Sequence, residues 1–178
     1  GNTTPEAAEL LQKGEVPISA WNLLAAQALV DDPAELFGNL RRYREKYLQE
    51  KEIPQTITGE VPALVEVFEL WEQLDQQNFA EDYRTMLQDT AEEAETMSLE
   101  RADEHLDVKQ LQLVHKQLRL AGSLQEKQEY FLPMYLGEQL AGVHLTLQQG
   151  AGAVGAVEIR VNAGDMELEA HLQVKGDT

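Results

Sequence analysis

The spacing of apolar and polar residues divides the chain into two parts. Over the first two-thirds, apolar side chains recur every three to four residues, as they do along one face of an α-helix. After about Gln128 they recur at every second residue, which is typical of strands with one buried and one solvated face. The sequence predicts an α+β protein with an N-terminal acidic helical region, residues 1–127, and a C-terminal antiparallel β-meander of three or four strands, residues 128–178.

Capping residues indicate where several helices begin and end. Thr4-Pro5 is expected to open a short helix that Gly14 closes in a left-handed conformation. A second helix is expected from about residue 19 to residue 31, and capping boxes at residues 32–35 (DPAE) and 78–81 (NFAE) predict two more. Residues 64–74 and a long segment from Ser98 to about Gly122 also have helical spacing. Trp21 and Trp71 lie on apolar stripes, so we expect both in the core.

The strands are predicted from strict alternation. Apolar residues occupy every second position of residues 143–147, 157–161 and 166–174. Residues 130–136 are expected to add a fourth strand, which Pro133 confines to an edge because proline has no N–H for a ladder.

The last two strands are expected to form a hairpin around the turn cluster at residues 162–165. With that turn, Val161 pairs with Met166 and Arg160 lies opposite Glu167. Glu158 then lies opposite Glu169, an unfavourable pair of like charges.

Three glycines raise the question of a nucleotide site. Gly150, Gly152 and Gly155 have the spacing of a dinucleotide-binding fingerprint. That fingerprint requires the glycines to open a helix whose N-terminal amides bind the pyrophosphate. Here a strand pattern follows them, so we interpret residues 150–155 as a hairpin loop and expect no nucleotide cofactor.

Charge and composition exclude several classes of function. The formal net charge of −18 argues against binding to nucleic acid or to an anionic membrane surface. The absence of cysteine removes disulfides, thiolate catalysis and zinc–thiolate sites. No apolar run approaches the roughly 18 residues that span a bilayer. We therefore expect a cytoplasmic protein without direct membrane insertion.

A search for catalytic and metal-binding patterns yields one candidate cluster. The four histidines form no metal-ligand pair at helical spacing, and no nucleophile motif occurs, so no catalytic, cofactor or metal residue is assigned and no enzymatic activity is expected. The segment ERADEHLD, residues 100–107, gathers acidic side chains on a predicted helix. It is either a solvated helix face or the basis of an alternative function, a small-ligand or metal-binding domain that uses helix carboxylates.

The polar face of the predicted sheet provides the candidate interaction site. If the alternation holds, five side chains from neighbouring strands project to this face: His144, Thr146, Arg160, Glu169 and His171. An exposed sheet face can bind a protein, and an outer strand can accept an extra strand from a partner. The leading hypothesis is therefore a non-catalytic protein-interaction module.

The segments YFLPMYLGEQLAGVHLTLQQG and GAVEIRVNAGDMELEAHLQVKGD carry a partial family resemblance. Their β-alternation and glycine positions resemble the C-terminal domain of flagellar hook-length control proteins and clostridial relatives, over about residues 128–178. The resemblance implies a bacterial, non-enzymatic protein that contacts the flagellar export gate and switches it from hook to filament substrates. Its partners would be flagellar export components, and the protein itself would be cytoplasmic or exported through the flagellar apparatus. Because that domain normally continues into an amphipathic helix, we expect the β-meander here to be truncated at its C-terminus.

Overall fold

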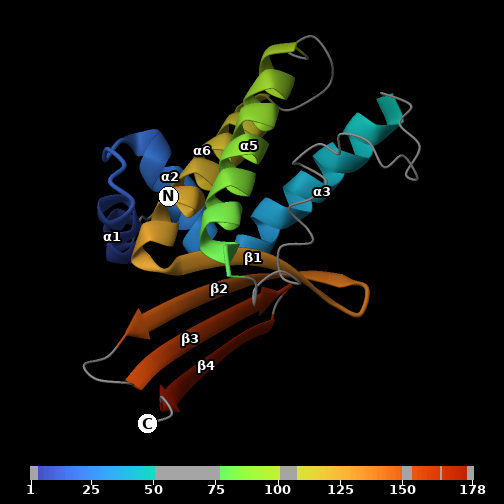
Figure 1. Cartoon of the computed structure of the whole chain (residues 1–178). Coiled ribbons are helices and arrows are strands. Elements are labelled where there is room, and N and C mark those ends of the chain that lie inside the picture. Colours follow the sequence, from blue (N-terminus) through green and yellow to red (C-terminus); the bar gives the residue numbers. More distant parts are fainter. Residues whose placement is uncertain (1–3, 51–76, 101–107, 150–153, 165, 176–178) are drawn as a thin grey trace.

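A computed structural model describes residues 4–50, 77–100, 108–149, 154–164 and 166–175. Within them, five helices precede a four-stranded antiparallel sheet, which confirms the α+β class (Figure 1). The helices are α1 (Pro5–Lys13), α2 (Ala20–Asp31), α3 (Pro33–Glu50), α5 (Phe79–Glu100) and α6 (Val108–Leu124), and a 3₁₀ turn spans Gln125–Lys127. The strands are β1 (Glu129–Leu136), β2 (Gln139–Gln149), β3 (Val154–Ala163) and β4 (Met166–Lys175).

Most helix starts agree with the capping prediction. Ser19 caps α2 by accepting a hydrogen bond of 3.1 Å from the Asn22 amide, and α3 and α5 begin directly after residues 32 and 78. The end of α1 differs from the expectation. Gly14 has a φ of −82°, and the residue with positive φ is Glu15, at 56°.

The boundary between the last two helices was misplaced. α5 continues to Glu100, past Ser98, where a new helix was expected, and α6 begins at Val108. α6 packs against α1, α2, α3, α5 and β1, so it is buried on several sides, in agreement with its wide apolar face. The expected helix at residues 64–74, with Trp71, lies outside the described residues.

Trp21 does not belong to the core as expected. Its side chain is 42% exposed, and Leu24 on the same helix is 52% exposed. α2 turns the smaller residues Ala25 and Ala26 inward together with Leu29, all of which are buried. The apolar positions of α2 surround the helix, so spacing alone did not identify the buried side.

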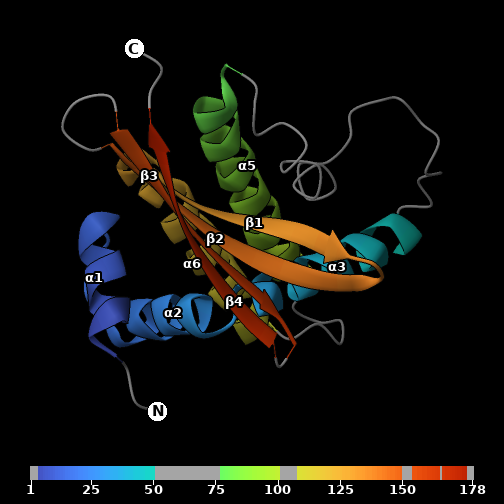
Figure 2. The ribbon, with the colours of Figure 1, turned by 90° about the horizontal axis from the view of Figure 1, so that it is seen from below.

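The sheet is a meander with strand order β1-β2-β3-β4, and β1, with Pro133, forms one edge as predicted. Figure 2 views the molecule from below and shows the strands in front of α2 and α6, so the helices gather on one side of the sheet. The strand that follows the glycine-rich segment pairs with β2 from Gly155 onward. A helix does not begin there, which excludes the dinucleotide-binding arrangement.

The predicted register of the last hairpin is wrong by two residues. Ala163 pairs with Met166, so two residues form the turn instead of four, and Gly164 takes a φ of 60°. Val161 therefore lies opposite Leu168, and Arg160 lies opposite Glu169. A shift of two leaves every side chain on its predicted face.

A close backbone contact fixes the sheet beneath the helices. A Cβ atom on Gly142 of β2 would clash with the Ala34 nitrogen and would lie 2.5 Å from the Pro33 carbonyl carbon. A glycine here lets the junction of α2 and α3 rest directly on the sheet. Beside it, the Asn162 side-chain amide donates to the Asp31 carbonyl at 3.5 Å.

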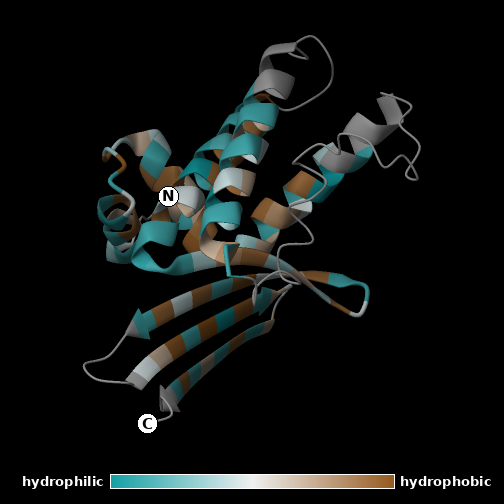
Figure 3. Cartoon of the chain, viewed as in Figure 1, coloured by the Kyte–Doolittle hydropathy of each residue, from teal (hydrophilic) through white to brown (hydrophobic). Residues whose placement is uncertain are grey.

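Burial falls from β1 toward β4. On β1, residues 129–133 are buried on both faces, whereas residues 166–173 of β4 are exposed on both faces. Figure 3 shows hydrophobic and hydrophilic bands alternating along β2, β3 and β4. The apolar bands of β4 include Met166, Leu168 and Leu172, which are 49%, 54% and 53% exposed. The alternation along the strand predicts that this set is buried, so the prediction is wrong for these three residues.

Candidate functional site

The five sequence-predicted residues do lie on one face of the sheet. His144 on β2 is opposite Arg160 on β3, which in turn is opposite Glu169 on β4. In the next row, Thr146 is opposite Glu158, which is opposite His171. The structure thus brings the five together, and their role as an interaction surface stays a prediction.

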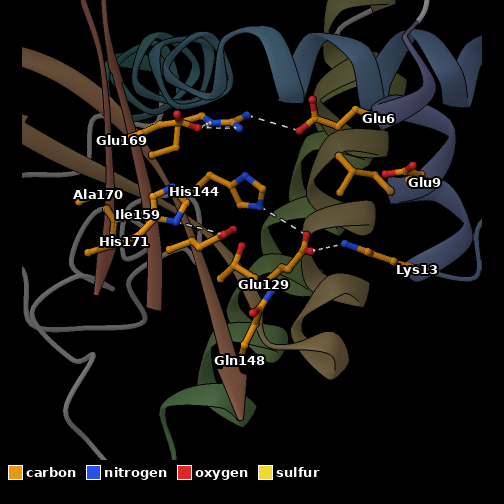
Figure 4. A pocket seen from close by; sticks show the side chains of 14 residues that line it. Glu6, Glu9, Lys13, Glu129, His144, Gln148, Ile159, Glu169, Ala170 and His171 are labelled. Atoms are coloured by element: carbon orange, nitrogen blue, oxygen red, sulfur yellow. Dashed lines mark hydrogen bonds and ion pairs between the residues drawn. The ribbon is translucent and has the colours of Figure 1, made fainter. Parts of the chain in front are cut away.

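This face is less open than expected, because α1 lies over part of it. Between α1 and the sheet is a cleft of about 160 Å³ (Figure 4). Arg160 lines this cleft, with Nη1 3.4 Å from Glu6 of α1, Nη2 3.0 Å from Glu169 and Nε 3.6 Å from Glu167. One guanidinium therefore faces three carboxylates.

Three other residues that line the cleft, Lys13, Glu129 and His144, form a charge network. The Glu129 carboxylate is only 5% exposed, accepts a hydrogen bond of 2.8 Å from Lys13 Nζ, and lies 3.4 Å from His144 Nε2. Figure 4 shows Lys13 and His144 reaching Glu129 from opposite sides. The His144 ring stacks on Phe131 with centroids 4.2 Å apart and an interplanar angle of 11°.

These contacts alter the acid–base properties of the pair. Burial alone would raise the pKa of the Glu129 carboxyl, but the hydrogen bonds from His144 and Lys13 outweigh it and hold that pKa below its ordinary value. The hydrogen bond to Glu129 also raises the pKa of Lys13. Both groups are therefore charged over the neutral range.

Sequence reasoning missed Glu129, Lys13 and Glu6. Lys13 and Glu129 are separated by 116 positions, and Glu6 and Arg160 by 154. Nothing in the local spacing brings the first helix to the sheet. For Glu129, the alternation along β1 was the one available signal, because it places this carboxylate on the same face of the strand as the apolar Phe131.

The cleft does not have the features of a ligand site. Small-molecule pockets are usually about 300–1,000 Å³ and mostly apolar, whereas this one is about 160 Å³ and lined by charged side chains that pair with one another. No group of three metal-ligating residues occurs within the described ranges. The acidic segment on which the metal or ligand alternative depended, residues 100–107, lies outside them except for Glu100, the last residue of α5.

The outer edge of β4 is a second candidate surface. In a hairpin with a two-residue turn, the residues that close the turn exchange both backbone hydrogen bonds, and the pattern then alternates. Since Ala163 and Met166 close this turn, the N–H and C=O groups of residues 167, 169, 171 and 173 point away from β3. No strand pairs with that side in the part of the chain that the structure describes.

The apolar face of β4 continues onto the neighbouring strand. Leu168 is opposite Val161, and Leu172 is opposite Val157. The two valines are half-buried against the core, and the two leucines are exposed. The outer strand therefore presents an apolar surface on one face and glutamates on the other.

No family model, curated protein or solved structure matches the chain. None of the described helices has the length and apolar character to cross a membrane.

Proposed function

We propose that the protein is a non-catalytic protein-interaction module that binds its partner through β4. The observation that carries this proposal is the half-exposure of Leu168 and Leu172 on the outermost strand. Leucines on a strand normally lie against a core, and contiguous exposed apolar surface is typical of binding sites. Full burial of a leucine contributes about 1.5–3 kcal/mol, so a partner that covers both residues would gain affinity from them.

The resemblance to hook-length control proteins suggests a more specific form of this function. In that form the partner is a component of the flagellar export apparatus, and the protein acts in the cytoplasm or passes through the apparatus. β3 and β4 contain the segments GAVEIRV and MELEAHLQV, on which the resemblance depends. Binding of purified export-gate components would test this form.

The proposed function is tested by cross-linking in cells of the source organism. A photoreactive amino acid at Leu168 or Leu172 is expected to capture the same protein, whereas one at Gln88, an exposed position on α5, captures none. The captured protein is then identified by mass spectrometry, purified and titrated with the chain. Leu168→Lys should weaken binding about tenfold or more, because it removes the apolar contact of the leucine and places an unpaired charge in the interface.

Gln88→Lys adds the same charge elsewhere and serves as the matched control. It should leave the affinity unchanged. The proposal is overturned if cross-linking at β4 does not exceed cross-linking at Gln88, or if Leu168→Lys binds the partner as tightly as the native chain.

A further inference from the structure

We propose that β4 accepts a fifth strand, an extended segment of a partner protein in which basic and apolar side chains alternate. This inference rests on the proposed function and names the mode of binding and the chemistry of the partner. It requires an open backbone edge, a polar face of the right charge and an apolar face that the added strand extends.

The backbone edge of β4 is suited to pairing. Ten consecutive residue pairs join β3 and β4, from Val154 with Lys175 to Ala163 with Met166, without a bulge. The strand contains no proline. Edge strands that must stay unpaired are usually short, bulged, interrupted by proline, covered or charged. Among the described residues, the long, regular edge of β4 has only the last of these protections, the glutamates of its polar face, which would not repel a basic strand.

The polar face of the edge has an excess of negative charge. Glu167 and Glu169 are 57% and 53% exposed, and both share Arg160 with Glu6 of α1. The single positive charge of Arg160 is therefore shared among three carboxylates. In a strand added to β4, the residues directly opposite Glu167 and Glu169 project to the same face, where a lysine or arginine would form favourable cross-strand pairs.

The apolar face of β4 favours apolar side chains at the remaining positions of the added strand. Residues of the added strand that alternate with the basic ones project to the side of Leu168 and Leu172, and apolar side chains there would cover both leucines. The net charge of −18 favours the approach of a cationic segment. A second copy of the chain is disfavoured, because it has the same glutamates on β4 and the same net charge.

The test uses a capped synthetic peptide of about eight residues that alternates lysine and valine. In a strand that pairs antiparallel to β4 with its lysines on the polar face, the backbone N–H groups of the lysines point toward β4 and those of the valines point away. Methylation of the lysine backbone nitrogens should weaken binding to the full chain about tenfold or more, measured by calorimetry. Methylation of the valine nitrogens should have little effect. A peptide that alternates glutamate and valine should not bind.

Variants of the protein test the same contacts from the other side. His171→Pro removes an outward N–H without removing a bond to β3, and should weaken binding of the lysine–valine peptide, whereas His171→Thr keeps the N–H and should not. Glu167→Gln combined with Glu169→Gln should weaken it about fivefold or more through loss of charge pairing. Hydrogen exchange should show new protection at the amides of residues 167, 169 and 171 when the peptide binds.

The outcomes separate this inference from the proposed function. Equal binding of the two methylated peptides, or no binding of the unmethylated one, overturns strand addition, whether or not cross-linking at Leu168 identifies a partner. Concentration-dependent dimers in sedimentation, with the same β4 amides protected, would assign the edge to a second copy and also overturn it. Absence of a captured partner together with peptide binding that is sensitive to lysine N-methylation would support the edge chemistry and count against the proposed function.

Discussion

β1 and β4 are the outer strands of the same sheet, and the backbone groups at their outer edges differ in their hydrogen-bond partners. At β1, the Phe131 amide donates to the Tyr83 hydroxyl at 2.8 Å, and that hydroxyl donates to the Phe131 carbonyl at 3.0 Å. Pro133, two residues on, has no N–H to pair. At β4, the outward backbone groups of four residues have no strand beside them within the described ranges. One edge is closed by a helix, and the other has no strand or helix paired with it in the part of the chain that the structure describes.

The closed edge shows how a helix can substitute for a strand. A tyrosine hydroxyl both donates and accepts, so Tyr83 of α5 satisfies both outward groups of one β1 residue. Its ring packs against Phe79 and Tyr130, with centroids 5.9 Å and 5.0 Å away. Burial raises the pKa of Tyr83, which keeps the hydroxyl protonated as a donor. β4 has no equivalent in the described structure and packs extensively on β3 alone.

The largest expected effect concerns the covered half of the sheet. Gly142→Ala should lower the free energy of unfolding by about 3 kcal/mol, because its Cβ would meet the backbone of Pro33 and Ala34, which cannot rotate away. Gly155→Ala on β3 is the matched control, since its nearest contact would be an ordinary 3.7 Å to the Gln148 carbonyl oxygen. Urea denaturation measures both. Equal losses would mean that the helix junction does not press on the sheet.

The next effect concerns the closed edge itself. Tyr83→Phe keeps the ring but leaves the buried N–H and C=O of Phe131 without their partner, which should cost about 2 kcal/mol. Tyr135→Phe, on an exposed tyrosine near the end of β1, is the control and should cost less than about 0.5 kcal/mol. Thermal denaturation of the native chain and of the two variants measures both losses of stability. A Tyr83→Phe protein as stable as the native chain would show that water satisfies the β1 edge.

Much of the fold could be predicted from the sequence because its signals are local. The change in periodicity near Gln128 located the sheet, and Pro133 identified its edge. The hairpin register failed because Asn162 and Ala163 look like turn residues but continue the ladder, so that Gly164 opens a turn of two. The local pattern predicts on which face of the sheet a residue lies more reliably than it predicts which residue of the next strand it pairs with.

The candidate site was less accessible to sequence reasoning. The alternation correctly grouped His144 and Arg160 on one face, but it does not tell which face the helices cover. The polar face was expected to be open, yet α1 lies over it because Glu6 pairs with Arg160 and Lys13 with Glu129. Contacts between residues more than a hundred positions apart leave no trace in a single sequence. The exposure of the β4 leucines could not be predicted for the same reason.

The charge network beneath α1 should make the stability of the protein depend on pH. Because the pKa of Glu129 is lower in the folded state, its contribution is complete above the unfolded value of about 4.3 and is lost as the pH falls through the folded value. The pKa of Lys13 is raised, so its contribution is present below about 10.4 and is lost as the pH rises through its folded value. The pair should therefore stabilise the protein most between these limits.

Glu129→Gln tests this dependence. It should lower the free energy of unfolding at neutral pH by about 1–2 kcal/mol, since Lys13 and His144 lose their charged partner. Melting temperatures measured from pH 7 down to about 3 should then fall less steeply than those of the native chain. Glu138→Gln, in the exposed turn between β1 and β2, should keep the native profile. An unchanged acid slope in Glu129→Gln would assign the acid sensitivity to other carboxylates.

The smallest effect is expected at the open edge. Leu168→Thr should change the free energy of unfolding by no more than about 0.5 kcal/mol, because the side chain is already 54% exposed and threonine suits an exposed strand. The same change should weaken binding of the captured partner by about tenfold, since the complex would bury the leucine that the free protein leaves half in solvent. Leu168→Met preserves the apolar surface and should keep both stability and affinity. Urea denaturation and calorimetric titration of the same samples separate the two quantities. A large loss of stability in Leu168→Thr would show that β4 belongs to the core rather than to an interface, and the contrast between the two edges would then disappear.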